Sequence, residues 1–152
     1  LGSSLKMGGI INDVNETDLE SLYDIGLNLG LAFQIQDDYL DLFGDQNLIG
    51  KKIGGDIIKR KKTVMYHVFK EISNDDDSQT LDQLYNDLNS DDGSKIQKVF
   101  DLFKNANVDI KTKDLVKNYS AKAINSLENL DIENDKKSEL IQICNKLISR
   151  DF

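Results

Sequence analysis

Apolar positions recur along the whole chain at the three- and four-residue spacing of amphipathic helices, and no segment shows the strict alternation of a strand. The opening residues, Leu1–Ile11, have the pattern of a helix interior. Further helices are predicted over residues 18–43, 62–73, 81–89, 95–106, 112–130 and 135–150. The pattern therefore predicts an all-α fold.

Short polar signals predict where these helices begin. Thr17, Thr80 and Ser94 are each followed three residues later by Glu or Gln, which is the spacing of a capping box. Residues 45–60 read as a loop rich in glycine. The acidic runs at 75–77 and 91–92 are each predicted to be a solvated loop that assists the start of the next helix.

One helix is unusual because it carries three aspartates among apolar neighbours. Asp37, Asp38 and Asp41 share a helical stripe with Gln34, at spacings of three and four residues. The apolar neighbours are Phe33, Ile35, Leu40, Leu42 and Phe43. No lysine or arginine lies between Asp13 and Lys51, so a bound cation is the expected partner. Oxygen ligands favour Mg²⁺; the alternative is an N-cap cluster or a fortuitous acidic stripe.

The same helix offers an apolar wall on the N-terminal side of the aspartates. Tyr23, Leu27, Gly30 and Leu31 project from the side that carries Gln34. One hypothesis is a site for a ligand with a phosphorylated head and an apolar tail. The alternative is that Leu27 and Leu31 simply pack in the core.

Composition narrows the class of protein. The 152 residues suffice for one domain, and 39% hydrophobic with 30% charged residues is typical of a soluble globular protein. Zero prolines favour long helices. A net charge of −8 argues against nucleic-acid binding, and no apolar run is long enough to span a membrane. The single cysteine, Cys144, is expected in the core and fits a reducing, cytoplasmic setting. His67 is expected to be partly buried.

Positive charge concentrates in the segment between Asp45 and Lys62, although the chain as a whole has a net charge of −8. The basic residues there are Lys51, Lys52, Lys59, Arg60, Lys61 and Lys62. Only Asp45 and Asp56 oppose them, so this segment could receive an anionic group.

Two motifs in this order resemble those of the trans-isoprenyl diphosphate synthases, or polyprenyl synthetases. The first runs Phe33-Gln34-Ile-Gln-Asp37-Asp38-Tyr-Leu-Asp41, and resembles that family's second aspartate-rich motif. The second, from Gly50 to Thr63, resembles the family's loop G-K-x-x-G-x-D-x-x-x-x-K-x-T. The chain departs from the usual pattern at Lys59-Arg60, where relatives often have an acidic or small residue and then glycine or asparagine.

The resemblance implies a role for each matching residue. Asp37 would bind Mg²⁺ directly, and Asp38 and Asp41 directly or through water. Lys51 and Lys61 would contact the diphosphate, although Lys62 remains an alternative to Lys61.

By the same resemblance, Gln34 would face the reacting carbons or the second substrate, and Phe33 would line the substrate site. Asp56 would orient the glycine loop or a lysine. The substrates would be an allylic diphosphate and isopentenyl diphosphate, and the product a linear polyprenyl diphosphate.

The resemblance covers the C-terminal half of the family's isoprenoid-synthase helical bundle. We expect the N-terminal half, with its first aspartate-rich motif, to be missing from residues 1–152, so that this chain alone would be inactive. The family implies a homodimer. Two alternatives stay open: a non-catalytic partner subunit of a prenyl synthase, and a terpene cyclase.

Overall fold

The computed structural model describes residues 1–45 and 53–148, and every regular element in those ranges is a helix, as the sequence predicts. The helices are α1 (Gly2–Ile11), α2 (Glu16–Phe43), α4 (Gly55–Ile58), α5 (Val64–Ile72), α6 (Asp75–Asn86), α7 (Asp92–Asn105), α8 (Val108–Glu128) and α9 (Asn134–Ile148). They form two compact units, 1–34 with 115–152 and 35–114. That all residues belong to a single domain stays a prediction.

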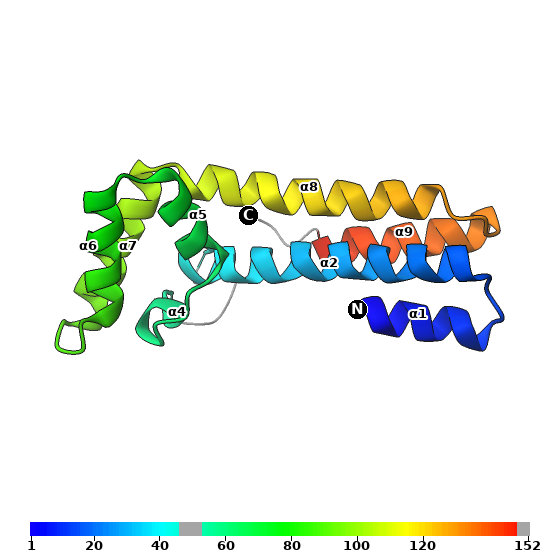
Figure 1. The fold of residues 1–152 in the computed structure, drawn as a ribbon, viewed down its shortest axis with the longest axis horizontal. Helices are drawn as coiled ribbons and strands as arrows, with labels where there is room; N and C mark the ends of the chain where they lie inside the picture. The colour runs from blue at the N-terminus through cyan, green and yellow to red at the C-terminus, as the bar shows by residue number, and fades with distance from the viewer. Residues whose placement is uncertain (46–52, 149–152) are drawn as a thin grey trace. The chain divides into compact units, whose positions relative to one another are not determined.

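The first unit contains α1, the N-terminal part of α2, the C-terminal part of α8, and α9, which lie side by side (Figure 1). Its core cluster is made by Ile25, Leu29, Ala123, Leu127, Leu130 and Cys144. Gly26 lets α1 approach α2 closely, because a Cβ there would lie 2.6 Å from the backbone nitrogen of Gly2. The absence of a side chain at this position thus allows the two helices to pack backbone to backbone.

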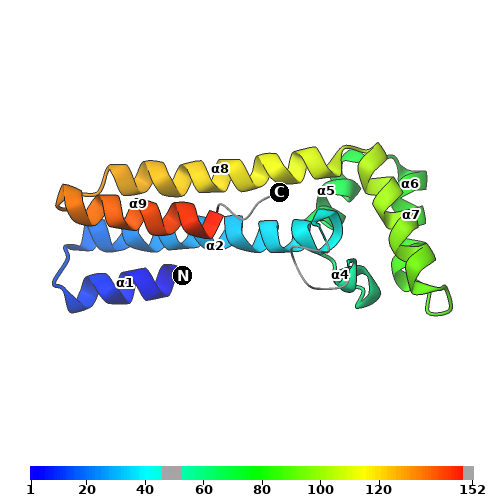
Figure 2. The same ribbon diagram turned by 180° about the vertical axis from the view of Figure 1, so that it is seen from behind.

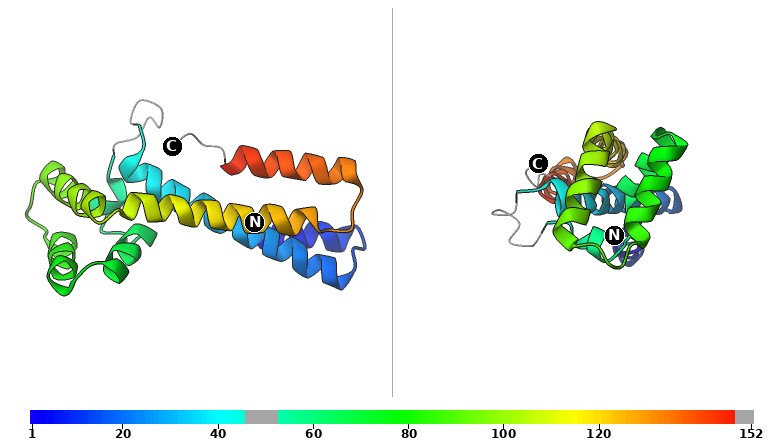
Figure 3. Two further views of the ribbon diagram at one scale, coloured as in Figure 1. Left: turned by 90° about the horizontal axis from the view of Figure 1, so that it is seen from above. Right: turned by 90° about the vertical axis from the view of Figure 1, so that its left-hand side faces the viewer.

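The second unit contains the end of α2, helices α4 to α7 and the start of α8. Helices α6 and α7 form a hairpin (Figures 2 and 3). Aromatic side chains join its elements: the rings of Phe69 and Phe103 lie 5.5 Å apart, and those of Tyr66 and Tyr85 lie 5.0 Å apart. All four residues are buried.

The helix starts differ from the predicted capping boxes. Asn15, not Thr17, caps α2, with its Oδ1 accepting the Asp18 N–H at 3.0 Å. Asn74 caps α6 in the same way through Asp77, and Asp91 caps α7 through Ser94. The run 75–77 is therefore the exposed first turn of α6, and the prediction of a loop there was wrong.

Two single residues test the predicted core. Cys144 is 5% exposed, which confirms its place in the core, and burial raises the pKa of its thiol. The prediction that His67 is partly buried was wrong, because it is exposed, whereas the residues on either side of it in α5, Tyr66 and Val68, are buried. Within the described ranges, no helix has the length and apolar character needed to cross a membrane.

Candidate functional site

The three aspartates of α2 lie in different environments. Asp38 is buried, at 6% exposure, whereas Asp41 is half-buried and Asp37 is exposed. The prediction that apolar side chains surround all three aspartates was therefore wrong for Asp37. Successive residues of a helix point about 100° apart, so Asp37 can face solvent while Asp38 faces the core. The exposed carboxylate of Asp37 and the buried one of Asp38 can face a ligand from adjoining directions.

Lys61 supplies a partner that the sequence analysis did not anticipate for Asp38. Its Nζ lies 2.9 Å from Oδ1 of Asp38 and 3.0 Å from Oδ2 of Asp56. These two hydrogen bonds raise the pKa of the Lys61 ammonium well above its ordinary value. The side chain is 48% exposed, so solvent screens the pair, and the ammonium remains within reach of an incoming anion.

Residues Gly54–Lys61 are held against the end of α2 by hydrogen bonds from their backbone N–H groups. The Gly54 N–H donates to the carbonyl of Asp41 at 2.6 Å, and the Asp56 N–H donates to Oδ2 of Asp41 at 3.0 Å. After the single turn of α4, the Lys61 N–H donates to the carbonyl of Asp56 at 2.8 Å. These hydrogen bonds bring Lys61 back to α2, where its side chain meets Asp38.

Two residues in this fold-back have left-handed backbone. Gly54 has φ of 77° and packs on α7, where a Cβ would lie 2.7 Å from the side chain of Ile96. Arg60 has φ of 56°. Glycine and asparagine adopt that conformation most readily, so an arginine here carries backbone strain.

The structure separates Lys61 from Lys62. Lys61 contacts the carboxylates, whereas the Nζ of Lys62 lies 5.1 Å from the ring centre of Tyr66. Lys61 is thus the lysine at the acidic cluster. Lys51 lies outside the described residues.

Gln34 and Phe33 precede the aspartates on α2 and belong to the first unit. Gln34 is exposed and Phe33 is half-buried. The apolar wall on this helix is also open: Tyr23 is 37% exposed, Leu27 45% and Leu31 38%. In the part of the chain that the structure describes, Leu27 and Leu31 are therefore not core residues.

Tyr85 is a neighbour of the site that the sequence analysis missed. It is 3% exposed, and burial is the main cause that raises the pKa of its phenol, followed by the charges of Tyr66, Asp56 and Asp41. The last two place it within electrostatic range of the carboxylate cluster. No local pattern marks Tyr85, because it lies on α6, far along the chain from α2.

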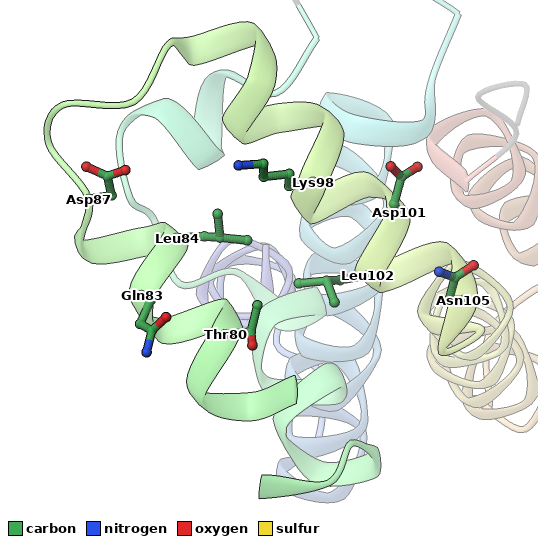
Figure 4. Close-up of a pocket in the computed structure, with 8 residues that line it drawn as sticks. All are labelled: Thr80, Gln83, Leu84, Asp87, Lys98, Asp101, Leu102 and Asn105. Carbon is green, nitrogen blue, oxygen red and sulfur yellow. The ribbon is translucent and has the colours of Figure 1, made fainter. Parts of the chain in front are cut away.

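A cavity of about 600 Å³ lies between α6 and α7, away from the predicted site residues. In Figure 4, Leu84 and Leu102 project toward each other from the two helices, with Lys98, Asp87 and Asp101 around them. The remaining lining is polar: Thr80, Gln83 and Asn105.

The carboxylates suit a hard divalent cation in their chemistry. Mg²⁺ is usually held by one or two carboxylates and keeps water on its other positions, and Asp37 and Asp38 can supply that set. The Lys61 ammonium against Asp38 shows that this position already receives positive charge. Among residues 1–45 and 53–148, no three acidic, histidine or cysteine side chains converge as a complete metal cage.

These features define an all-α protein with a site of carboxylates and lysine, built on one helix and the loop that follows it. Residues 1–103 match the polyprenyl synthetase family, and the chain belongs to that family. It is 36% identical over 137 residues to the geranylgeranyl diphosphate synthase of Saccharolobus solfataricus, covering 86% of this chain and 39% of that protein.

Solved structures agree on the fold. Geranylgeranyl pyrophosphate synthetase from Pyrococcus horikoshii aligns with a TM-score of 0.86 and 31% identity, over 99% of this chain and 45% of that one. Polyprenyl synthase from Caulobacter crescentus, complexed with calcium and isoprenyl diphosphate, aligns with a TM-score of 0.82 and 26% identity, over 98% and 45%. The chain thus spans less than half the length of these relatives.

Proposed function

We propose that the complete protein is a trans-prenyltransferase that condenses isopentenyl diphosphate with an allylic diphosphate. The observation that carries the proposal is the meeting of Asp38, Asp56 and Lys61, which come from the two motifs. A negatively charged cluster beside a solvent-accessible ammonium suits a ligand that combines divalent cations with diphosphate. The relatives named as geranylgeranyl diphosphate synthases support the same reaction.

In this reaction, the allylic C–O bond breaks and diphosphate leaves. The double bond of isopentenyl diphosphate then forms the new C–C bond, and a proton is lost to give the product. Bound Mg²⁺ would neutralise the leaving diphosphate. Asp37 would hold the metal directly, and Asp38 and Asp41 directly or through water.

Lys61 would turn from Asp38 toward the leaving group as a point charge, with Lys51 as a second one. Gln34 and Phe33 would contact the substrate beside the apolar stripe of Tyr23, Leu27 and Leu31. The partial exposure of Tyr23, Leu27 and Leu31 supports this role, because it leaves their side chains accessible to a ligand.

The proposal extends to the rest of the protein. An N-terminal half corresponding to the uncovered part of the relatives would complete the site, and the whole would form a homodimer in the cytoplasm. Residues 1–152 alone are expected to be inactive, because in this family the other metal-binding motif, the first aspartate-rich one, belongs to the N-terminal half.

The test measures incorporation of labelled isopentenyl diphosphate into extractable polyprenyl product by the full-length protein. Asp37→Ala is expected to lower turnover by about 100-fold, since one preorganised electrostatic partner is lost. Asp76→Ala is the matched control, because Asp76 is an exposed aspartate in the first turn of α6, and it should leave turnover unchanged. Near-normal turnover of the Asp37 variant would overturn the proposal.

A further inference from the structure

Asp41 makes three contacts with the loop that follows α2. Its carbonyl accepts the Gly54 N–H and its Oδ2 accepts the Asp56 N–H. Its Oδ1 lies against Gly55, where an added Cβ would be 3.3 Å away. Backbone and both carboxylate oxygens of one residue thus face three successive residues of the loop.

The loop needs such contacts to hold its position. Helix α4 has only four residues, so its own hydrogen bonds cannot make it stable. Ile57, at 3% exposure, fixes one side of the turn in the core. Asp41 fixes its beginning, and the hydrogen bond from the Lys61 N–H to Asp56 fixes its end.

A chain of contacts leads from Asp41 through Asp56 to Lys61 and Asp38. Asp56, whose N–H is held by Asp41, places its own carboxylate 3.0 Å from Lys61 Nζ. Lys61 reaches Asp38, one turn before Asp41 on α2. The four residues therefore form a closed ring of contacts that begins and ends on the same helix.

We propose that Asp41 is a positioning residue, which fixes the Gly54–Lys61 loop so that Lys61 stands at Asp38, and is not a direct metal ligand. The proposal rests on the proposed function and narrows it, because it removes direct coordination by Asp41 from its set of metal ligands. A carboxylate whose Oδ2 accepts a backbone N–H and whose Oδ1 faces Gly55 is poorly placed to coordinate a cation directly. Asp37 and Asp38 already supply the one or two carboxylates that Mg²⁺ commonly uses.

The experiment compares Asp41→Asn, Asp41→Ala and Asp37→Asn in the full-length protein. Hydrogen–deuterium exchange of the peptide covering Gly54–Lys61 reports the position of the loop. Asparagine keeps an oxygen that can accept the Asp56 N–H, so exchange should stay within about threefold of the wild type, whereas alanine should accelerate it by about tenfold. Mn²⁺ binding in the presence of inorganic diphosphate reports the metal site.

For a positioning residue, Mn²⁺ affinity stays within about threefold in both Asp41 variants and falls by about tenfold or more in Asp37→Asn. The kcat of Asp41→Ala falls, or its KM for the allylic substrate rises, by about tenfold, and Asp41→Asn shows a smaller change than Asp41→Ala in the same parameter. Equal loss of Mn²⁺ affinity in Asp41→Asn and Asp41→Ala, without faster exchange, would overturn the proposal. Failure of the proposed function is a different result: Asp37→Asn would then change neither Mn²⁺ affinity nor turnover.

Gly55→Ala tests the same contact without altering the acid. Its new Cβ would press on Oδ1 of Asp41 at 3.3 Å, so the exchange of the loop should rise to a level between those of the two Asp41 variants, with Mn²⁺ affinity unchanged. Unchanged exchange in Gly55→Ala and in Asp41→Ala would overturn the positioning role, even if both proteins fold normally.

Discussion

At the scale of single residues, Arg60 is held in a backbone conformation that suits it poorly. Its φ of 56° puts Cβ close to the following carbonyl group, which costs about 1 kcal/mol for a residue other than glycine or asparagine. The conformation persists because it lets the Lys61 N–H reach Asp56 and the Arg60 N–H reach Ile57. The strain therefore belongs to the turn that delivers Lys61 to the carboxylates.

Arg60→Gly and Arg60→Asn are expected to stabilise the protein by about 0.5–1 kcal/mol, measured as an increase in the free energy of unfolding in urea. Lys59→Gly is the matched control, because Lys59 has φ of −74° and gains nothing from glycine. It should be neutral or destabilising. Loss of stability in both Arg60 variants would show that the arginine side chain contributes more than its backbone costs.

Sequence reasoning placed the candidate site residues on their elements but did not find all of their neighbours. Helical spacing correctly placed Asp37, Asp38 and Asp41 on α2, because that relation is local. The ion pair of Asp38 with Lys61 depends on the turn at α4 and on a left-handed Arg60, which local patterns do not encode. The exposure of Asp37 was missed because apolar neighbours in sequence need not be neighbours in space.

At the scale of elements, α5 is joined to α6 by a polar cluster around Asp82. Its carboxylate accepts hydrogen bonds from the Tyr66 hydroxyl and, at 2.7 Å, from Lys70. These two bonds lower the pKa of Asp82. Burial, together with the bond to Asp82, raises the pKa of Tyr66 to about 12.

The pH dependence of this cluster follows from the neutral phenol of Tyr66. Its folded pKa, about 12, lies above the ordinary value of 10.0, so the stabilisation is complete below pH 10 and is lost as pH rises through about 12. Titration of tyrosinate by near-ultraviolet absorbance should show a late step, and Tyr66→Phe should lower its amplitude by one tyrosine, the buried Tyr85 supplying the rest. A late step of undiminished amplitude in Tyr66→Phe would contradict the raised pKa of Tyr66.

The helix boundaries show where local signals were sufficient. Periodicity located α2, α5, α7, α8 and α9 to within a few residues, because it reports the buried face. The starts of α6 and α7 were placed too late, since Asn74 and Asp91 cap them without the Glu or Gln that completes a capping box. Asparagine and aspartate are strong caps by themselves.

At the scale of the whole molecule, the first unit exposes apolar side chains on two of its helices. On α1 they are Met7, Ile10 and Ile11, the last 81% exposed. On α2 they are Tyr23, Leu27 and Leu31, one helical stripe. Contiguous exposed apolar surface of this kind favours association with another protein surface.

Residues 1–152 alone are therefore expected to self-associate, and the double substitution Leu27→Gln with Leu31→Gln should reduce this association. Analytical ultracentrifugation measures it, and circular dichroism checks that helix content is kept. Leu29→Gln is the matched control, because Leu29 lies in the core at 5% exposure. A buried unpaired amide there should cost about 2–4 kcal/mol and lower the unfolding temperature, which the exposed pair should not do. Unchanged association in the double variant would assign the contact to α1 or to another surface.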